Sequence, residues 1–475
     1  MTTQQIAALL LLFTCFALVI PPSSPTTTSA VLKLGCDIED RVCYLRNVYA
    51  SEGDRFKNME GSEGADVIEF FDCHIHTLPR IPYIKRVRAT GIKLVRILEK
   101  TFATVVHLDV SSNRLREFSA GAFEWPEEVQ SLNIGGNPLL RDVSVVMKLI
   151  ELLDLQMPDM KLDLELVDKN IFSGMKNLKT LNLSNNKIVT VPVGIFNRLE
   201  SLELLDLSNN YITRINAGSM VIIYEPYSLR KRSLTISLSK NNISIIENNS
   251  FMVVKNVDLS DNKLIGIGPT AFNNGSELEI LTLSGNRQLR NFNFLKPLGT
   301  LHTLTMSNMN FTFAGIPLDV FRGQDNLASL DLSHNDIETL PIGIFSDLSS
   351  VNYINLRYNR ISHVEFGTFS IRKYDLIDEI DLSYNELSDL NYLVFVPLKY
   401  LRVLLLHGNQ IPYVNADQLK RSRSLQNFGI QNNPISCSDL VDLLGVYKLV
   451  LDGQEFVAHE PNVNGIRCNP SDRLV

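Results

Sequence analysis

One short line of sequence recurs along most of this chain, and its spacing constrains the fold more than any other feature. Clear copies are LKTLNLSNNKIVTVPVGIF, LASLDLSHNDIETLPIGIF and VNYINLRYNRISHVEFGTF, at residues 178–196, 327–345 and 351–369. One position in the line, nearly always asparagine, occurs fourteen times at steps of 21 to 31 residues. A repeat of this period indicates a solenoid of stacked coils rather than several globular domains. The fourteen residues are Asn113, Asn137, Pro158, Asn186, Asn210, Asn241, Asn262, Asn286, Met309, Asn335, Asn359, Asn385, Asn409 and Asn433.

The apolar positions of the line predict how each coil is built. Two leucines flank one variable residue, and because side chains alternate along a strand, both leucines point into the core while the residue between them faces outward. The asparagine then turns inward, where its amide can hydrogen-bond the backbone of adjacent coils. Ten positions further on, a recurring phenylalanine predicts a buried spine on the outer side, formed by Phe123, Phe196, Phe251, Phe272, Phe345, Phe369 and Phe395.

These features match the leucine-rich repeat, L-x-x-L-x-L-x-x-N-x-L. Because one coil cannot bury its own apolar face, its stability comes from the coils stacked on either side. We therefore expect an α/β solenoid, a leucine-rich-repeat horseshoe whose concave side is lined by a parallel β-sheet. The repeats are expected over 67–436, between an N-terminal cap at 31–66 and a C-terminal cap at 437–475.

The segment FFDCHIHTLP at residues 70–79 holds Cys73, His74 and His76, which raises the question of a metal site. Aligned with LSHNDIETLP, the segment places Cys73 at the asparagine position, where cysteine is an accepted alternative. Alternation then points the two histidines away from the thiol. We expect a ladder thiol at Cys73, with an N-terminal disulfide as the alternative and a metal site as the least favoured one.

The remaining cysteines suggest two closed caps. Without Cys15 of the leader, five cysteines remain, and an odd number in a secreted protein needs an explanation that a buried ladder thiol supplies. The other four lie in pairs at the two ends, where a solenoid would otherwise expose its core. We therefore expect disulfides between Cys36 and Cys43 and between Cys437 and Cys468, formed in an oxidising compartment.

The first thirty residues predict a signal peptide, residues 1–30. An apolar run of fifteen residues, from Ile6 to Ile20, is followed by PPSSPTTTSA, and this length suits a signal peptide better than a membrane span. No later stretch of eighteen apolar residues occurs, so we expect a secreted, extracellular protein without a membrane span. The net charge of −7 lacks the basic excess that nucleic-acid binding requires.

The caps carry a more specific resemblance than the repeats. The segment NNPISCSDLVDLLGVYKLV…GIRC, at 432–468, is similar to the end of the repeat domain in insect secreted immune proteins, and the C-x6-C at 36–43 resembles their amino-terminal cap. The repeats also resemble those of Toll-like receptor ectodomains. The insect proteins include mosquito haemolymph proteins that act with complement-like factors, so the resemblance implies innate immunity and possible complement-like partners. The sequence given ends seven residues after Cys468 without their coiled coil, so we expect a monomer when the protein is alone.

The common catalytic and nucleotide-binding motifs do not occur in the sequence. The sequence contains no G-x-S-x-G, G-x-x-x-x-G-K or H-E-x-x-H, and we expect neither an enzyme nor a cofactor or metal. A column of aspartates between the two leucines could form an acidic track for a cation or a basic partner. The alternative is that aspartate is a common occupant of an exposed strand position. The column consists of Asp206, Asp258, Asp331 and Asp381.

Two departures from the repeat indicate where a partner could bind. The position before the ladder asparagine is usually small and polar, but it becomes His334, Tyr358 and Tyr384 in successive coils. Arg357 and His407 occupy the neighbouring position, and aromatic residues and arginine are enriched in binding hot spots. We predict that these five side chains lie together on the concave face and bind a protein or microbial surface ligand, although ordinary surface variation is the alternative. The second departure is a 31-residue step that carries the Arg230–Arg232 basic trio, expected as a solvated loop tip.

Glycosylation signals restrict the choice of binding face. A sugar in the concave sheet at Asn182 would block part of it, which favours the coils after Asn310, where no sequon occurs. The leading function is a secreted recognition or adaptor protein, plausibly in innate immunity. A matrix or receptor-associated protein with a structural or regulatory role is the alternative. The N-x-S/T sequons are at Asn182, Asn242, Asn248, Asn274 and Asn310.

Overall fold

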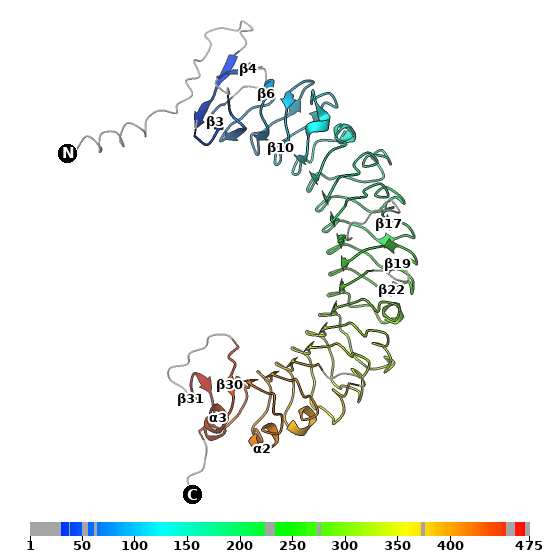
Figure 1. The fold of residues 1–475 in the computed structure, drawn as a ribbon, viewed down its shortest axis with the longest axis vertical. Coiled ribbons are helices and arrows are strands. Elements are labelled where there is room, and N and C mark those ends of the chain that lie inside the picture. Colours follow the sequence, from blue (N-terminus) through cyan, green and yellow to red (C-terminus); the bar gives the residue numbers. More distant parts are fainter. Residues whose placement is uncertain are drawn as a thin grey trace, which may run out of the picture. The chain divides into compact units, whose positions relative to one another are not determined.

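The computed structural model describes residues 30–37, 39–49, 56–60, 64–223, 233–272, 277–371, 376–452 and 461–470. Residues 1–29 of the predicted signal peptide, the Arg230–Arg232 trio and the Asn274 sequon lie outside the described residues. The chain divides into two compact units, Met1–Ile212 with Ser219–Lys231 and Thr213–Gly218 with Arg232–Val475. We call them the first and the second unit and describe each by itself (Figure 1).

Each coil of the first unit contributes one short strand to a sheet on the inner side of the unit. The sheet begins with an antiparallel pair, and all later pairings are parallel and in register. In the three-residue repeat strands the middle residue is buried and the flanking residues face outward, as leucine alternation predicts. The strands are β2 (Gly35–Asp37), β3 (Val42–Arg46), β5 (Val67–Phe71), β7 (Arg86–Arg88), β10 (His107–Asp109), β12 (Ser131–Asn133), β13 (Asp154–Gln156), β14 (Thr180–Asn182) and β15 (Leu204–Asp206).

The second unit has the same construction. Its inner sheet is parallel throughout, and the last strand belongs to the C-terminal cap. The strands are β18 (Thr235–Ser237), β21 (Asn256–Asp258), β23 (Ile280–Thr282), β24 (Thr303–Thr305), β25 (Ser329–Asp331), β26 (Tyr353–Asn355), β27 (Glu379–Asp381), β28 (Val403–Leu405), β29 (Asn427–Gly429) and β30 (Lys448–Leu449).

Shorter elements complete the coils away from the inner sheet. Short parallel ladders join β1 (Ala30–Lys33) to β4 (Phe56–Glu60), β6 (Ile81–Tyr83) to β9 (Phe102–Thr104), and β8 (Arg96–Ile97) to β11 (Glu117–Phe118). A three-stranded ladder in the second unit joins β16 (Arg214–Ile215), β19 (Ile245–Ile246) and β22 (Gly266–Ile267). The other elements are β17 (Met220–Val221), β20 (Phe251–Met252), the antiparallel pair β31 (Asn462–Val463) and β32 (Ile466–Arg467), the 3₁₀ helices η1 (Pro126–Glu128), η2 (Ser144–Lys148), η3 (Asn293–Leu295) and η4 (Tyr392–Phe395), and the helices α2 (Ala416–Leu419) and α3 (Cys437–Leu444).

The ladder asparagines hold consecutive coils together through their amides. All twelve are buried, with at most 7% of their surface exposed. In Asn359, Nδ2 donates to the carbonyl oxygens of Leu332 in the preceding coil and Leu356 in its own, at 3.0 and 2.9 Å, while Oδ1 accepts the N–H of Ile337 at 3.1 Å. The Leu332 oxygen also accepts from Nδ2 of Asn335 at 2.9 Å, so successive asparagines share carbonyls along the column.

The coil of Met309, which lacks the asparagine, depends on the amide of the coil that follows it. Oδ1 of Asn335 accepts two backbone N–H groups there, from Met309 at 2.8 Å and Phe311 at 3.0 Å. Nδ2 of Asn335 donates to the Met306 oxygen at 2.7 Å, which no second amide shares within the described residues. Asn186 serves the coil of Pro158 in the same way.

The predicted phenylalanine spine packs in both units. Phe345 stacks on Phe369 with ring centroids 5.6 Å apart, and Phe369 stacks on Phe395 at 6.0 Å. The seven predicted rings are all buried. Phenylalanines that the sequence pattern did not single out extend the row, namely Phe102, Phe172, Phe294 and Phe321.

Disulfides close both ends of the described solenoid, between Cys36 and Cys43 and between Cys437 and Cys468. Cys73 is a free, buried thiol whose Sγ donates to the carbonyl oxygens of Phe71 at 3.2 Å and Leu45 at 3.4 Å. It therefore hydrogen-bonds the backbone as the ladder amides do. Within the described residues, no three His, Cys, Asp or Glu side chains gather in an arrangement that could hold a metal ion. No helix in this part of the chain is long and apolar enough to cross a bilayer.

Candidate functional site

The residue before each ladder asparagine has a left-handed backbone, which explains why small polar residues and glycine usually occupy this column. His334, Tyr358 and Tyr384 each have a φ of 54° in three successive coils of the second unit. A residue other than glycine in this conformation costs about 1–3 kcal/mol. Three adjacent coils therefore hold large rings at positions where the backbone does not favour them.

The three rings form a continuous stack. The centroids of His334 and Tyr358 are 4.4 Å apart, and those of Tyr358 and Tyr384 are 4.5 Å apart, with interplanar angles of 23° and 17°. Tyr358 remains 39% exposed. Gly408 follows in the same column, and a Cβ there would lie only 2.5 Å from the Tyr384 ring. Glycine at 408 therefore provides the space into which the last ring packs.

Arg357 lies beside this stack. Its guanidinium carbon is 4.9 Å from the Tyr358 centroid and 4.6 Å from that of Tyr384. Because the two centroids are themselves 4.5 Å apart, the guanidinium lies next to the pair and not between the rings. We call His334, Arg357, Tyr358 and Tyr384 the aromatic patch.

Asp452 of the C-terminal cap contacts the aromatic patch and was missed by sequence reasoning. Nη2 of Arg357 donates to Oδ2 of Asp452 at 2.7 Å, and the Asp452 N–H donates to the side chain of Gln431 at 2.8 Å. Burial acts to raise the pKa of Asp452, but the hydrogen bonds from Arg357 and Tyr384 outweigh it and hold that pKa below its usual value. The signal that could have revealed this contact is the pairing of Lys448 with Asn427. Four residues further along both strands, Asp452 lies opposite Gln431. Gln431 stands two residues before a ladder asparagine, as Arg357 does.

His407, the fifth predicted residue, does not share the exposed surface. Only 1% of it is exposed, and its Nδ1 has no hydrogen-bond partner among the described residues. Burial lowers the pKa of His407, which keeps the ring neutral near pH 7. The ring fits because residue 429 is glycine, where a Cβ would lie 2.4 Å from Nε2. The expectation that five side chains lie side by side is corrected here: His407 shares its column with Arg357, but its ring is buried in the space that Gly429 leaves.

The predicted acidic column has a structural role in each coil. Each of its four aspartates ends an inner strand and accepts, through Oδ1, the N–H of the residue two positions later. These distances are 2.8–2.9 Å. Such bonds satisfy backbone donors where the strand ends.

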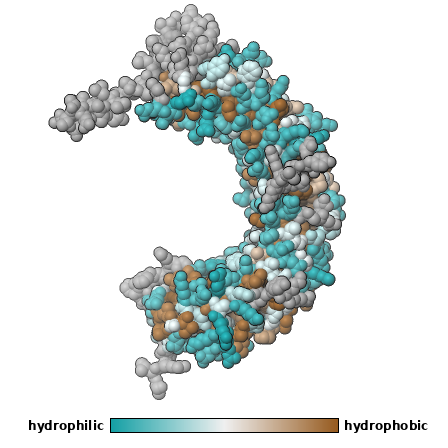
Figure 2. Space-filling view, viewed as in Figure 1, coloured by the Kyte–Doolittle hydropathy of each residue, from teal (hydrophilic) through white to brown (hydrophobic). Residues whose placement is uncertain are grey.

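Negative charge nevertheless gathers near the aromatic patch. Burial and the carboxylates of Asp381, Glu379 and Asp331 raise the pKa of Tyr353 to about 12. Burial, together with Asp381 and Asp378, also raises the pKa of Glu379. On the face seen in Figure 2, hydrophilic and apolar residues are interspersed in both units.

The sequons differ in accessibility. Asn182 on β14 is half-buried, and its Nδ2 donates to the side-chain oxygen of Gln156 at 2.8 Å. Asn242 is also half-buried, whereas Asn248 and Asn310 are exposed. Asn182 lies in the first unit, whereas the aromatic patch belongs to the second.

Comparison with protein families and curated relatives identifies the repeats. The family model "Leucine rich repeat" matches residues 176–221 and 313–370, and "BspA type Leucine rich repeat region (6 copies)" matches 223–312. Tsukushi-A of Xenopus laevis is 31% identical over 172 residues, which cover 36% of this chain and 47% of that protein. Toll-like receptor 3 of Boselaphus tragocamelus is 27% identical over 318 residues, 64% of this chain and 32% of the receptor. The chain thus matches less than half the length of each of these relatives.

Solved structures share the fold at low sequence identity. Toll in its complex with Spatzle from Drosophila superposes with a TM-score of 0.56 and 19% identity, covering 88% of this chain and 64% of that one. The LRIM1/APL1C complex gives a TM-score of 0.52 at 18% identity, covering 93% and 71%. The APL1 leucine-rich repeat domain gives 0.53 at 18%, covering 92% and 100%. With its ladder, spine and capped ends, this chain has the leucine-rich-repeat fold, with repeat models matching within 176–370, and it is similar in structure to Toll, LRIM1 and APL1.

Proposed function

We propose that this chain is a secreted recognition or adaptor protein that binds a protein or microbial ligand through the aromatic patch, in innate immunity. The observation that carries the proposal is the stack of three rings on left-handed backbone. Strained residues of this kind persist where the surrounding structure holds them, and they cluster at functional sites. Tyrosine suits such a surface because it offers a rigid apolar face with a polar tip.

Secretion is supported by the two disulfides, because such bonds persist in oxidising compartments. The immune role rests on analogy of fold and on the resemblance of the caps to those of insect immune proteins. The Toll–Spatzle complex is described as a molecular hub in Drosophila development and innate immunity, and LRIM1 is found in complex with APL1C. Complement-like factors are accordingly among the partners that we propose.

A second candidate function is an extracellular matrix or receptor-associated protein with a structural or regulatory role. It is favoured by the similarity to Tsukushi-A and to the leucine-rich repeat-containing G-protein coupled receptor 5 of Rattus norvegicus, which is 28% identical over 193 residues. Those residues cover 41% of this chain and 18% of the receptor. The partners that co-purify with the protein from body fluid separate the two candidates. Complement-like or pathogen components support the first, and matrix or receptor proteins support the second.

The aromatic patch is tested with the co-purified partner and a double variant, Tyr358→Ala with Tyr384→Ala. Binding should weaken by about 2 kcal/mol or more, about 30-fold, if these rings are hot spots. The matched control replaces Tyr400 and Tyr413 by alanine, since both are 58% exposed in the same unit and lie outside the stack. Unchanged binding by the first variant, with loss on replacing Arg230–Arg232 instead, would move the site to the insertion.

A further inference from the structure

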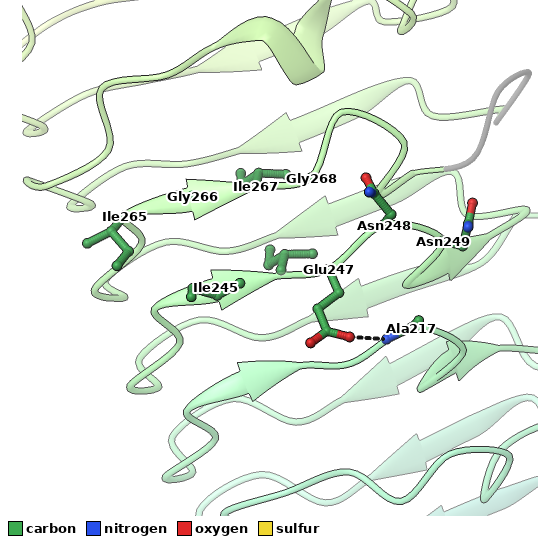
Figure 3. Close-up of a pocket in the computed structure, with 10 residues that line it drawn as sticks. Ala217, Ile245, Glu247, Asn248, Asn249, Ile265, Gly266, Ile267 and Gly268 are labelled. Atoms are coloured by element: carbon green, nitrogen blue, oxygen red, sulfur yellow. Dashed lines mark hydrogen bonds between the residues drawn. The ribbon is translucent and has the colours of Figure 1, made fainter.

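A shallow groove lies on the three-stranded ladder of the second unit, away from the aromatic patch. Its volume is about 730 Å³, and it runs over β19 and β22 (Figure 3). Figure 3 shows Ile245 and Ile265 at one end of the groove, Ile267 between, and Asn248 at the other end. A volume of this size lies within the range of about 300–1,000 Å³ typical of ligand sites.

The groove exists because glycines face outward in β22 and directly after it. Ile245 pairs with Gly266, and Ile246 pairs with Ile267. Ile246 and Ile267 point into the core, with 1% and 9% exposed, so alternation directs residues 266 and 268 outward. Both are glycine, and a Cβ on Gly266 would meet no atom within 4 Å. The missing side chain of Gly266 leaves open space above the strand.

The wall nearest Ala217 is fixed by an ionic contact. Oε1 of Glu247 lies 3.1 Å from Nη1 of Arg214, and Oε2 accepts the Ala217 N–H at 3.1 Å. Both carboxylate oxygens are therefore engaged within the protein, and Glu247 shapes the groove instead of providing a free charge to a ligand.

Asn248 joins this groove to the sequon Asn248-Asn249-Ser250. Its Oδ1 accepts the Thr270 N–H at 3.1 Å, and a Cβ at residue 268 would lie 2.5 Å from that oxygen. Because the amide is planar, fixing Oδ1 also fixes the direction of Nδ2, the atom to which an N-linked sugar is joined. Nδ2 makes no hydrogen bond within the described residues, unlike that of Asn182. Gly268, directly after β22, thus lets this amide lie in one defined orientation.

We propose that Asn248 carries an N-linked glycan and that the first sugars of this glycan bind in the groove. The bond forms between Nδ2 and C1 of N-acetylglucosamine on a diphosphate-linked oligosaccharide donor, while the C1–O bond to the diphosphate breaks and the amide loses one proton. The first sugars then lie over Gly266 with their apolar faces against Ile245. This inference uses the secretion proposed above but is independent of the aromatic patch.

The test compares two glycans on one molecule. The protein is expressed through a eukaryotic secretory pathway and treated, while folded, with an amidase that cleaves the asparagine–sugar bond. Mass spectrometry then follows the conversion of Asn248 and Asn310 to aspartate. Asn310 is the internal control because it is exposed and lies outside the groove. We expect release at Asn248 to be about tenfold slower than at Asn310, with equal rates after denaturation.

A variant with a filled groove distinguishes binding of the glycan in the groove from steric hindrance by other residues around Asn248. Gly266→Leu occupies the open space and should bring release at Asn248 up to the rate at Asn310, while Lys263→Leu, at an exposed position outside the groove, should leave it slow. Equal rates of release at Asn248 and Asn310 in the native wild-type protein would contradict binding of the glycan in the groove. Slow release at Asn248 that persists in Gly266→Leu would contradict it as well. A glycan at Asn310 with none at Asn248 would overturn it as well, and absence of both would also count against secretion.

Discussion

Replacing Asn335 should destabilise the protein far more than replacing Asn359, although both are ladder asparagines with 7% of their surface exposed. In Asn359→Ala, the oxygens of Leu332 and Leu356 keep hydrogen bonds from Asn335 and Asn385. The Ile337 N–H alone loses its partner.

In Asn335→Ala, three buried backbone groups lose the only hydrogen bond that they make among the described residues: the N–H groups of Met309 and Phe311 and the oxygen of Met306. The Leu332 oxygen keeps its bond from Asn359. Each unsatisfied buried group costs roughly 1–3 kcal/mol, which gives roughly 3–9 kcal/mol for Asn335→Ala against roughly 1–3 for Asn359→Ala. Because the same atoms are deleted in both variants, the cavity term largely cancels in the difference.

Urea unfolding of the two variants, followed by circular dichroism, measures this difference. Repeat proteins need not unfold in one step, so hydrogen exchange of the Phe311 and Ile337 amides provides a local measure. Asn186→Ala should behave like Asn335→Ala, since Asn186 serves the coil of Pro158 in the same way. An equal loss in the free energy of unfolding for Asn335→Ala and Asn359→Ala would refute the argument that shared carbonyls protect the coil of Asn359.

Three further predictions follow from single contacts. The folded-state pKa of Asp452 is lower than its unfolded value of about 3.9, so its pairing with Arg357 stabilises the cap above that value and is lost as pH falls through the folded pKa. The protection of the Val450 amide, measured relative to its intrinsic exchange rate at each pH, should therefore fall in acid in the wild type but not in Asp452→Asn, and parallel profiles would contradict this. Burial raises the pKa of the Cys73 thiol, so alkylation should require unfolding; Cys73→Ser should cost about 1–3 kcal/mol, and rapid labelling of the folded protein would argue against a ladder position. Glycopeptide mapping should find Asn182 unmodified because its Nδ2 is bonded to Gln156, and a sugar there would show that this bond forms only after modification is complete.

The periodic part of the fold could be predicted because every coil buries the same kinds of side chain at the same positions. Asn359 and Phe369 occupy positions that every neighbouring coil also uses, so alternation and spacing predict a buried amide and a buried ring. The same reasoning predicts both disulfides, since only the ends of a solenoid need closing.

The candidate site was less predictable because it depends on where individual side chains go within a coil. The identity of Tyr358 and Tyr384 indicated a special column, but its left-handed backbone appears only in the structure. His407 and Arg357 share a column, yet Gly429 makes room for the imidazole below the surface while the guanidinium extends to Asp452. Such contacts, over a sequence separation of 95 residues in the second case, have no local signature.

The carbonyls that successive ladder amides share have a mechanical consequence. Removing a coil from within the repeats leaves behind an end of similar construction, so each coil can leave the stack as a separate step. A molecule stretched between its termini should therefore lengthen coil by coil. Coils of 21 to 31 residues, at about 3.3–3.6 Å per extended residue, give increments of roughly 70–110 Å. The coils of Asn186 and Asn335 should resist extraction longest, because each supplies bonds that its neighbour cannot replace.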